Sequence, residues 1–199
     1  MSKAHFKGSK ARYEFRVWGK RKDACRRLST LADVELEEEL HDCYLLVADC
    51  GCNAKIRRNQ LKVKTLIGKR SGFERWSTMW HRLSDEVPQP FDQLMSELSN
   101  RSPRKRGHER TVAKTIDKLD LDNDLRAVVV DKHRRRFQFG SIRAEATDLF
   151  VQGQPRRLRT LAIEGPDLDD LIRVRSLLGL AKVPNLALHL AVELQHGGE

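Results

Sequence analysis

The stretch NAKIRRNQLKVK, residues 53–64, alternates cationic and apolar side chains on both sides of a short polar break. The cationic positions are Lys55, Arg57, Lys62 and Lys64, and the apolar positions between them are Ala54, Ile56, Leu61 and Val63. Successive residues of a β-strand point to opposite faces of the sheet. The pattern therefore predicts a β-hairpin with one apolar face and one cationic face.

Two further segments carry the same pattern. Residues 12–17 place Arg12, Glu14 and Arg16 on one parity, and residues 128–139 do so with Lys132, Arg134 and Arg136. A single cationic strand face usually points to water, but several in one chain favour a shared interior. If the sheet closes with its apolar face outward, its lumen holds charges that cannot stay dry and unpaired. Such a lumen would contain water and a polyanion.

The remaining segments indicate strands in both halves of the chain. Helices are expected at 20–31, 90–100 and 166–179, and extended segments at 34–49, 65–76, 126–140, 141–153, 156–165 and 185–195. This order predicts an α+β fold, an antiparallel sheet or barrel with helices packed outside. We expect one domain over residues 1–199, whose strand-rich halves, 10–99 and 111–195, are joined by a basic linker at 100–110.

The overall charge restricts the class of partner. The chain has 199 residues, of which 33% are charged, and a net charge of +10. A basic protein favours nucleic acid, phosphorylated small molecules or acidic membrane surfaces. No apolar run approaches the roughly 18 residues of a membrane span, and the first residues lack the apolar core of a secretory signal. We therefore expect a cytoplasmic protein without a membrane segment.

Two local clusters allow more than one interpretation. His41, Cys43, Cys50 and Cys52 could hold a metal ion, but their spacing differs from the usual zinc knuckle, which favours reduced cysteines. The basic linker, residues 100–110, could be a nucleic-acid arm, but a solvated loop is the simpler interpretation.

Five segments, in order along the chain, resemble the CYTH superfamily, the triphosphate tunnel metalloenzymes. They are YEFRVWG, YLLVADCGCNAKIRRNQLKVK with the following GFERW, VVVDKHRRRFQF, IRAEATDL, and TLAIEGPDLDDLIRVRSLLGLAKVPN. The resemblance implies an eight-stranded antiparallel tunnel-like barrel. It also implies a lumen that binds triphosphate-containing or polyphosphate substrates with a divalent ion, Mg²⁺ or Mn²⁺.

The resemblance also assigns the site residues. The first strand of the family reads Glu-x-Glu-x-Lys, where this chain has Arg12, Glu14 and Arg16, and a late Glu-x-Glu corresponds to Ala162 and Glu164. Two carboxylates are thus absent, which weakens the expected metal site. The expected metal-binding and catalytic residues are Glu14, Glu145 and Glu164. The expected phosphate-binding residues are Arg16, Lys55, Arg57, Lys62, Lys64, Lys132, Arg134 and Arg136.

Two functions stay open on this basis. In the first, a metal held by the three glutamates polarises a terminal phosphoryl group, the cations neutralise developing charge, and water attacks. In the second, a lumen with more cations and fewer carboxylates binds polyphosphate or another polyanion without hydrolysing it. Nucleic-acid binding is less favoured, and the chain could act as a monomer or a homodimer.

Overall fold

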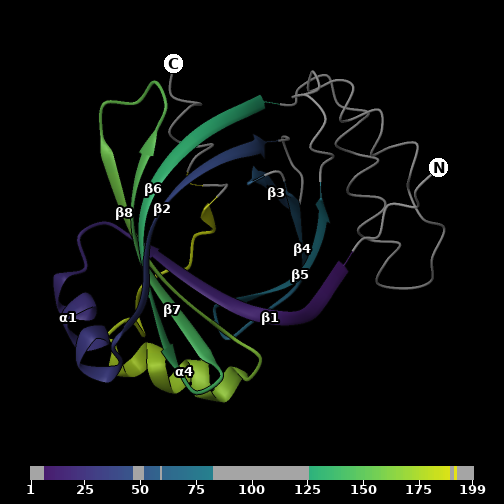
Figure 1. The fold of residues 1–199 in the computed structure, drawn as a ribbon. Helices are drawn as coiled ribbons and strands as arrows, with labels where there is room; N and C mark the ends of the chain where they lie inside the picture. The colour runs from purple at the N-terminus through teal and green to yellow at the C-terminus, as the bar shows by residue number, and fades with distance from the viewer. Residues whose placement is uncertain (1–6, 47–51, 59, 83–125, 189–190, 192–199) are drawn as a thin grey trace.

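The strands form a closed antiparallel barrel in the computed structural model, which describes residues 7–46, 52–58, 60–82, 126–188 and 191 (Figure 1). Around the barrel the order is β1-β5-β4-β3-β2-β6-β7-β8, and β8 pairs with β1 to close it. The strands are β1 Lys7–Trp18, β2 Val34–Leu46, β3 Cys52–Arg57, β4 Gln60–Arg70, β5 Phe73–Arg82, β6 Arg126–Phe139, β7 Ile142–Val151 and β8 Arg157–Gly165. The predicted fold class is confirmed.

The hairpin expected from residues 53–64 forms between β3 and β4, with Lys55 paired to Lys62. The next segment, 65–76, into which the hairpin was expected to run, supplies the end of β4 and the start of β5. It is split between β4 and β5 by a tight turn at Ser71 and Gly72, whose φ angles are 52° and 79°. Positive φ angles suit glycine and reverse the chain, so the segment supplies two strands.

In the described part of the chain, two helices pack on the outside of the barrel, close to each other in Figure 1. They are α1, Lys22–Leu31, and α4, Leu168–Leu177. Leu28 of α1 and Leu171 of α4 join one buried cluster with outward-facing strand residues such as Phe15. The Asp167 side chain caps α4 by accepting a hydrogen bond from the backbone N–H of Asp170 at 3.0 Å. The helices therefore cover the outward apolar side chains of β1 and its neighbours β7 and β8.

The strand expected at 185–195 is wrong in its described part. Residues 184–187 have no regular structure, and Leu188 and Ala191 are helical. The segment instead meets β1: the Arg16 N–H donates to Asn185 Oδ1 at 2.7 Å, and the Leu186 N–H donates to the Arg16 carbonyl at 3.0 Å. The eight strands already close the barrel, so they offer this segment only short lengths of free edge.

Some expectations fall on residues that the structure does not describe. The helix at 90–100 and the basic linker at 100–110 are among them. Within the described part, no helix is long and apolar enough to cross a membrane.

Candidate functional site

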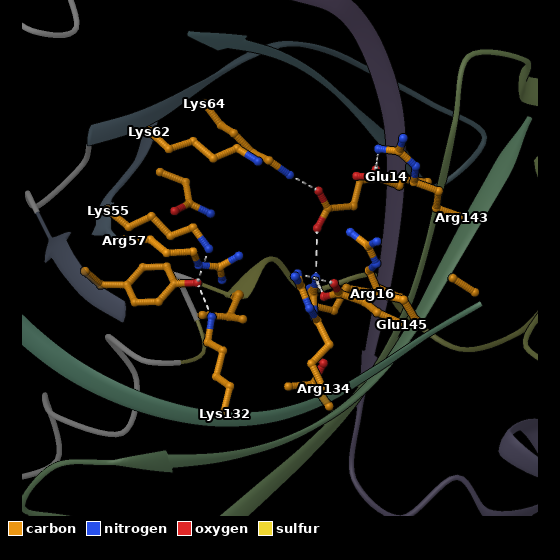
Figure 2. A pocket seen from close by; sticks show the side chains of 18 residues that line it. Glu14, Arg16, Lys55, Arg57, Lys62, Lys64, Lys132, Arg134, Arg143 and Glu145 are labelled. Atoms are coloured by element: carbon orange, nitrogen blue, oxygen red, sulfur yellow. Dashed lines mark hydrogen bonds and ion pairs between the residues drawn. The ribbon is translucent and has the colours of Figure 1, made fainter. Parts of the chain in front are cut away.

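A cavity of about 220 Å³ lies inside the barrel (Figure 2). Nine cationic side chains of the described residues line it: Arg16, Lys55, Arg57, Lys62, Lys64, Lys132, Arg134, Arg136 and Arg143. The carboxylates that line it are Glu14, Glu145 and Glu164. Every site residue expected from the sequence thus lies around one cavity, although their roles in binding and catalysis stay predictions.

Strand pairing explains why the cations converge. Lys55 faces Lys62 across β3 and β4, and Lys132 lies on the same face of β6 as Arg134. Directly paired residues point to the same side of a sheet, so closing the barrel turns all these faces inward. Leu61 and Val63 occupy the opposite face of β4 and are buried there. The alternation in the opening stretch therefore corresponds to inside and outside of the barrel.

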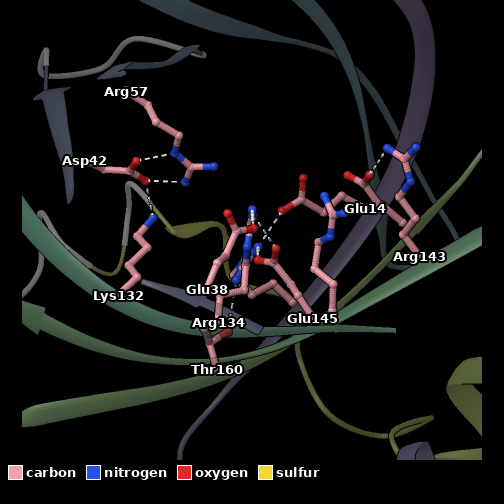
Figure 3. A network of polar contacts seen from close by, with 12 residues as sticks. Glu14, Glu38, Asp42, Arg57, Lys132, Arg134, Arg143, Glu145 and Thr160 are labelled. Atoms are coloured by element: carbon pink, nitrogen blue, oxygen red, sulfur yellow. Dashed lines mark hydrogen bonds and ion pairs between the residues drawn. The ribbon is translucent and has the colours of Figure 1, made fainter. Parts of the chain in front are cut away.

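The middle of the lumen contains a network of ion pairs centred on Arg16 (Figure 2). Figure 3 shows Glu14, Glu145 and Arg134 of this network. The Arg16 Nη2 lies 2.6 Å from Glu145 Oε1 and 3.2 Å from Glu14 Oε1. The other oxygen of Glu14 pairs with Lys64, and Arg134 pairs with both Glu145 and Glu38. Each carboxylate in the middle of the lumen is therefore engaged by at least one fixed cation.

These pairs hold the carboxylates ionised. Burial alone would raise the pKa of Glu14, but Lys64 and Arg16 outweigh it and lower that pKa to about 2. Burial would also raise the pKa of Glu145. Arg16 and Arg134 outweigh this effect, so the pKa of Glu145 lies well below its usual range. Burial would lower the pKa of Arg16, yet Glu145 and Glu14 raise it. All three groups stay charged across the physiological range.

A second network surrounds Asp42, whose side chain is completely buried. It accepts hydrogen bonds from Arg57 Nη2 at 2.7 Å, Lys132 Nζ at 2.7 Å and Lys55 Nζ at 2.9 Å. Lys132 also donates to the Tyr44 hydroxyl at 2.5 Å. One carboxylate thus balances three cations, which leaves two formal positive charges in this part of the lumen.

The lysines of the lumen have lowered pKa values. Burial lowers the pKa of Lys132 to about 8, although Asp42 partly opposes this. Burial, and then the neighbouring Lys64, lower the pKa of Lys62 to about 8, and burial and Lys132 lower that of Lys55 well below its usual range. The lumen therefore holds more positive charge than its own carboxylates balance, and an entering anion would stabilise the protonated lysines.

Glu164 and two arginines lie near the entrance of the cavity. Glu164 Oε1 is 3.8 Å from Arg143 Nη1 and 4.0 Å from Arg12 Nε. Arg12 is not among the residues that line the cavity, and its Nη2 donates to the Ser141 carbonyl. The cation at position 12 thus tethers the rim of the barrel and pairs with a carboxylate that was expected to bind metal.

Sequence reasoning missed several residues of the lumen: Glu38, Asp42, Tyr44 and Arg143. Among the other glutamates of this segment, Glu37 and Glu39 lie on the exposed outer side of β2, whereas Glu35, at the bulge between Val34 and Leu36, is 3.6 Å from Arg136. The usable signal was Tyr44, a large residue two positions from Asp42, because inward parity at Tyr44 places Asp42 and Glu38 inside as well.

The other histidines and cysteines lie apart from the lumen as far as they are described. His133 faces outward, 3.0 Å from Glu37. His41 is exposed and bonds to Asp131, and Cys43 lies on the same outer face. Cys50, the Cys52 side chain and His189 are outside the described residues, so a metal cluster at residues 41–52 stays untested.

The carboxylates of the lumen do not fit a resident divalent ion. Among the described residues, no three His, Cys, Asp or Glu side chains form a group that could hold one. Arg16 lies between Glu14 and Glu145, where an ion shared by these two carboxylates would sit. Oxygen ligands for Mg²⁺ need negative charge that is not already neutralised. Here the charges of Arg16, Lys64 and Arg134 already neutralise these carboxylates, in the place of a metal ion.

Solved structures share this fold at low sequence identity. A putative adenylyl cyclase from Hippeastrum, described as having a dominant triphosphatase activity, aligns with a TM-score of 0.60 and 11% identity over 92% of this chain and 95% of its own. The PH1012 protein of Pyrococcus horikoshii aligns with a TM-score of 0.55 and 17% identity, over 91% and 98%. A conserved hypothetical protein from Pyrococcus furiosus gives 0.53 and 16%, over 91% and 99%.

The chain has the triphosphate tunnel fold. The resemblance seen in the sequence is thereby confirmed at the level of the fold. No protein-family model matches the chain, and no curated protein matches it. At these identities the likeness establishes architecture, and the function must be argued from the residues of the lumen.

Proposed function

We propose that the lumen binds a triphosphate group or a short polyphosphate chain. The observation that carries the proposal is the lining itself, in which nine cations and three carboxylates from β1, β3, β4, β6, β7 and β8 surround one cavity. Arginine binds phosphate oxygens as a fork, and lysine binds them as a point charge. A chain of phosphates is the ligand class that needs many such groups along one channel.

The charge balance supports a ligand of this size. Among the described residues, six carboxylates, including Glu35, Glu38 and Asp42, face the nine cations of the lining, a formal excess of three positive charges. A linear triphosphate carries about four negative charges near pH 7, since each terminal group bears between one and two. Binding it would bring the lumen close to neutrality without an added cation.

Unused hydrogen-bond donors also favour an anionic ligand. The buried Nε atoms of Arg16, Arg134 and Arg136 donate to no acceptor within the described part of the chain. Lys62 lies 5.4 Å from the centre of the Trp80 ring and pairs with no described carboxylate. Buried donors without acceptors are costly. A phosphate oxygen in the cavity would supply Lys62 with an acceptor and would bring negative charge close to these arginines.

Hydrolysis of the bound chain is a second candidate. The triphosphatase activity named for the Hippeastrum protein, which shares the fold, favours it. The Mg²⁺ or Mn²⁺ that the sequence resemblance implies would belong to this reaction. The carboxylates that would hold such an ion are already paired with Arg16 and Lys64.

Calorimetry with linear tripolyphosphate tests the proposal, in EDTA and then with Mg²⁺ or Mn²⁺, alongside an assay of phosphate release. We expect one-to-one binding in EDTA. Lys62→Gln should weaken it by roughly 10- to 100-fold, since a hydrogen bond to a charged group is worth about 1.5–3 kcal/mol. Arg173→Gln, which removes an exposed cation from α4, is the matched control.

The outcomes of these measurements separate the candidates. Binding in EDTA without phosphate release under any condition supports a receptor, and metal-dependent release supports a phosphohydrolase. Absence of binding, or equal losses in Lys62→Gln and Arg173→Gln, would contradict a phosphate site in the lumen. Tighter binding of short single-stranded RNA lacking a 5′ triphosphate would instead favour a nucleic-acid partner.

A further inference from the structure

The lumen changes from charged to apolar along the barrel. On β6 the inward positions run from Lys132 to Val130, and on β7 Leu149 faces Lys132 and Val151 faces Val130. Directly paired residues share a side, so these apolar side chains also point inward. With others they form a buried cluster inside one end of the barrel: Tyr44, Leu46, Val128, Val130, Leu149, Val151 and Leu188, against which Trp18 and Leu158 pack.

The exposed fraction of the inward-facing side chains falls toward this cluster. Along β6 the exposed fraction of the side chain drops from 33% at Arg136 to 15% at Arg134 and 4% at Lys132. Along β7 it drops from 53% at Arg143 to 24% at Glu145. The decrease has the same direction on both strands, so the described lumen opens at Arg136 and Arg143 and deepens toward Lys132.

The charge at the deep end suits one particular group. Lys55, Arg57 and Lys132 meet there around Asp42, with two positive charges in excess. A terminal phosphoryl group carries between one and two negative charges near pH 7, whereas an internal phosphate of a chain carries one. The apolar residues beyond Tyr44 offer no partner to a further phosphate, and burying one there would be very unfavourable.

We propose that the lumen recognises the free end of a linear phosphate chain and does not thread the chain. The terminal phosphoryl lies against Lys55, Arg57 and Lys132, and the rest of the chain runs outward past Arg134 to the mouth. This inference rests on the proposed function, because it concerns the same lumen. It narrows the ligand class to molecules that end in an unsubstituted phosphoryl group.

The test compares long-chain polyphosphate with the same polymer whose two terminal phosphates are blocked as phosphoramidates. Calorimetry in EDTA gives the affinity and the number of protein molecules bound per chain. We expect the unblocked polymer to bind no more than two protein molecules, one at each end, and the blocked polymer to bind at least tenfold more weakly. Linear tripolyphosphate should likewise bind more tightly than cyclic trimetaphosphate, which has no end.

Variants then locate the contact. Lys132→Gln should lower the affinity for the unblocked polymer at least tenfold and leave the weak affinity for the blocked polymer unchanged. Arg173→Gln, the surface control, should affect neither. Equal affinities for blocked and unblocked polymer, or many protein molecules per chain, would overturn end recognition while leaving phosphate binding intact. Failure of linear tripolyphosphate to bind at all would overturn both proposals.

Discussion

Replacing Asp42 with asparagine removes the single carboxylate charge that Lys55, Arg57 and Lys132 share. The side chain keeps its shape, so the change is electrostatic. Breaking a buried ion pair by removing one partner typically costs about 3–5 kcal/mol. The two lysines can offset part of this loss by releasing protons, because burial already lowers their pKa values. We therefore expect a loss near 3 kcal/mol.

In a chain of this length, 1 kcal/mol shifts the melting temperature by about 2–4 °C. Asp42→Asn should therefore melt roughly 6–12 °C below wild type at pH 7. The gap should narrow as pH rises toward 9. A lysine whose pKa is lowered by folding binds fewer protons in the folded state than in the unfolded state, so stability rises with pH across that window. Deprotonation also relieves the uncompensated charge left by the substitution.

Linear tripolyphosphate should rescue the variant. A terminal phosphoryl would supply the negative charge that Asp42 no longer provides, so the ligand should raise the melting temperature of Asp42→Asn by more than that of wild type. Thermal unfolding followed by circular dichroism, with and without ligand, measures both effects. Asp131→Asn makes the same change at an exposed position of β6 and is the control.

Two results would refute this reasoning. If Asp42→Asn melts within about 2 °C of wild type, the carboxylate does not hold the three cations together. If the ligand shifts both proteins equally, the anion does not reach the deep end of the lumen.

Three further predictions follow from the same lumen. Arg12→Glu combined with Ala162→Glu should create Mn²⁺ affinity measurable by calorimetry and weaken metal-free tripolyphosphate binding; unchanged metal affinity would count against it. Affinity for tripolyphosphate should fall between pH 7 and 9, because Lys62 and Lys132 lose protons near their pKa of about 8. Binding at pH 8 should also take up protons, which calorimetry detects as an enthalpy that depends on the buffer. An affinity that does not change with pH would contradict this prediction. Deleting residues 102–108 should change the affinity less than twofold at physiological salt, where fields are screened beyond roughly 8 Å; a tenfold loss would point to a binding arm.

Sequence alternation predicted the barrel because several strands repeat it. In the hairpin of β3 and β4, Lys55, Arg57, Lys62 and Lys64 alternate with apolar residues, so only one register buries the apolar face. The same argument placed Lys132 and Arg134 on the face that turned out to line the cavity. These residues were predictable because the residues that alternate with the cations in the sequence are the ones that the fold buries.

The acidic strand β2 was not predictable in this way. Its first half, VELEEEL, has a glutamate on either parity, so the pattern does not decide which side faces inward. Leu40, Asp42 and Tyr44 are buried, and they set Glu38 inward as well. That register follows from pairing with β6, where Glu38 faces Arg134, and such long-range pairing is not encoded in the local alternation.

The closed end of the lumen was hidden for a similar reason. The run Val128–Val129–Val130 is apolar on both parities and indicates a strand without saying which side is interior. In the structure Val128 and Val130 are buried, whereas Val129 is partly exposed. The sequence therefore suggested a charged lumen throughout, and only the pairing of β6 with β7 reveals that one part of it is apolar.

The alanine at position 162, where the acidic pattern of the family has a glutamate, is coupled to the position of the Arg16 side chain. Ala162 directly faces Arg16 on β1 and Glu145 on β7, and its methyl group leaves the space in which the Arg16 guanidinium contacts Glu145 and Glu14. A glutamate at position 162 would compete for the same guanidinium and free a carboxylate for metal. With alanine there, the positive charge at the centre of the lumen belongs to the chain itself. An anion entering the lumen thus meets a cation that chelators cannot remove, which is why binding in EDTA is the decisive measurement.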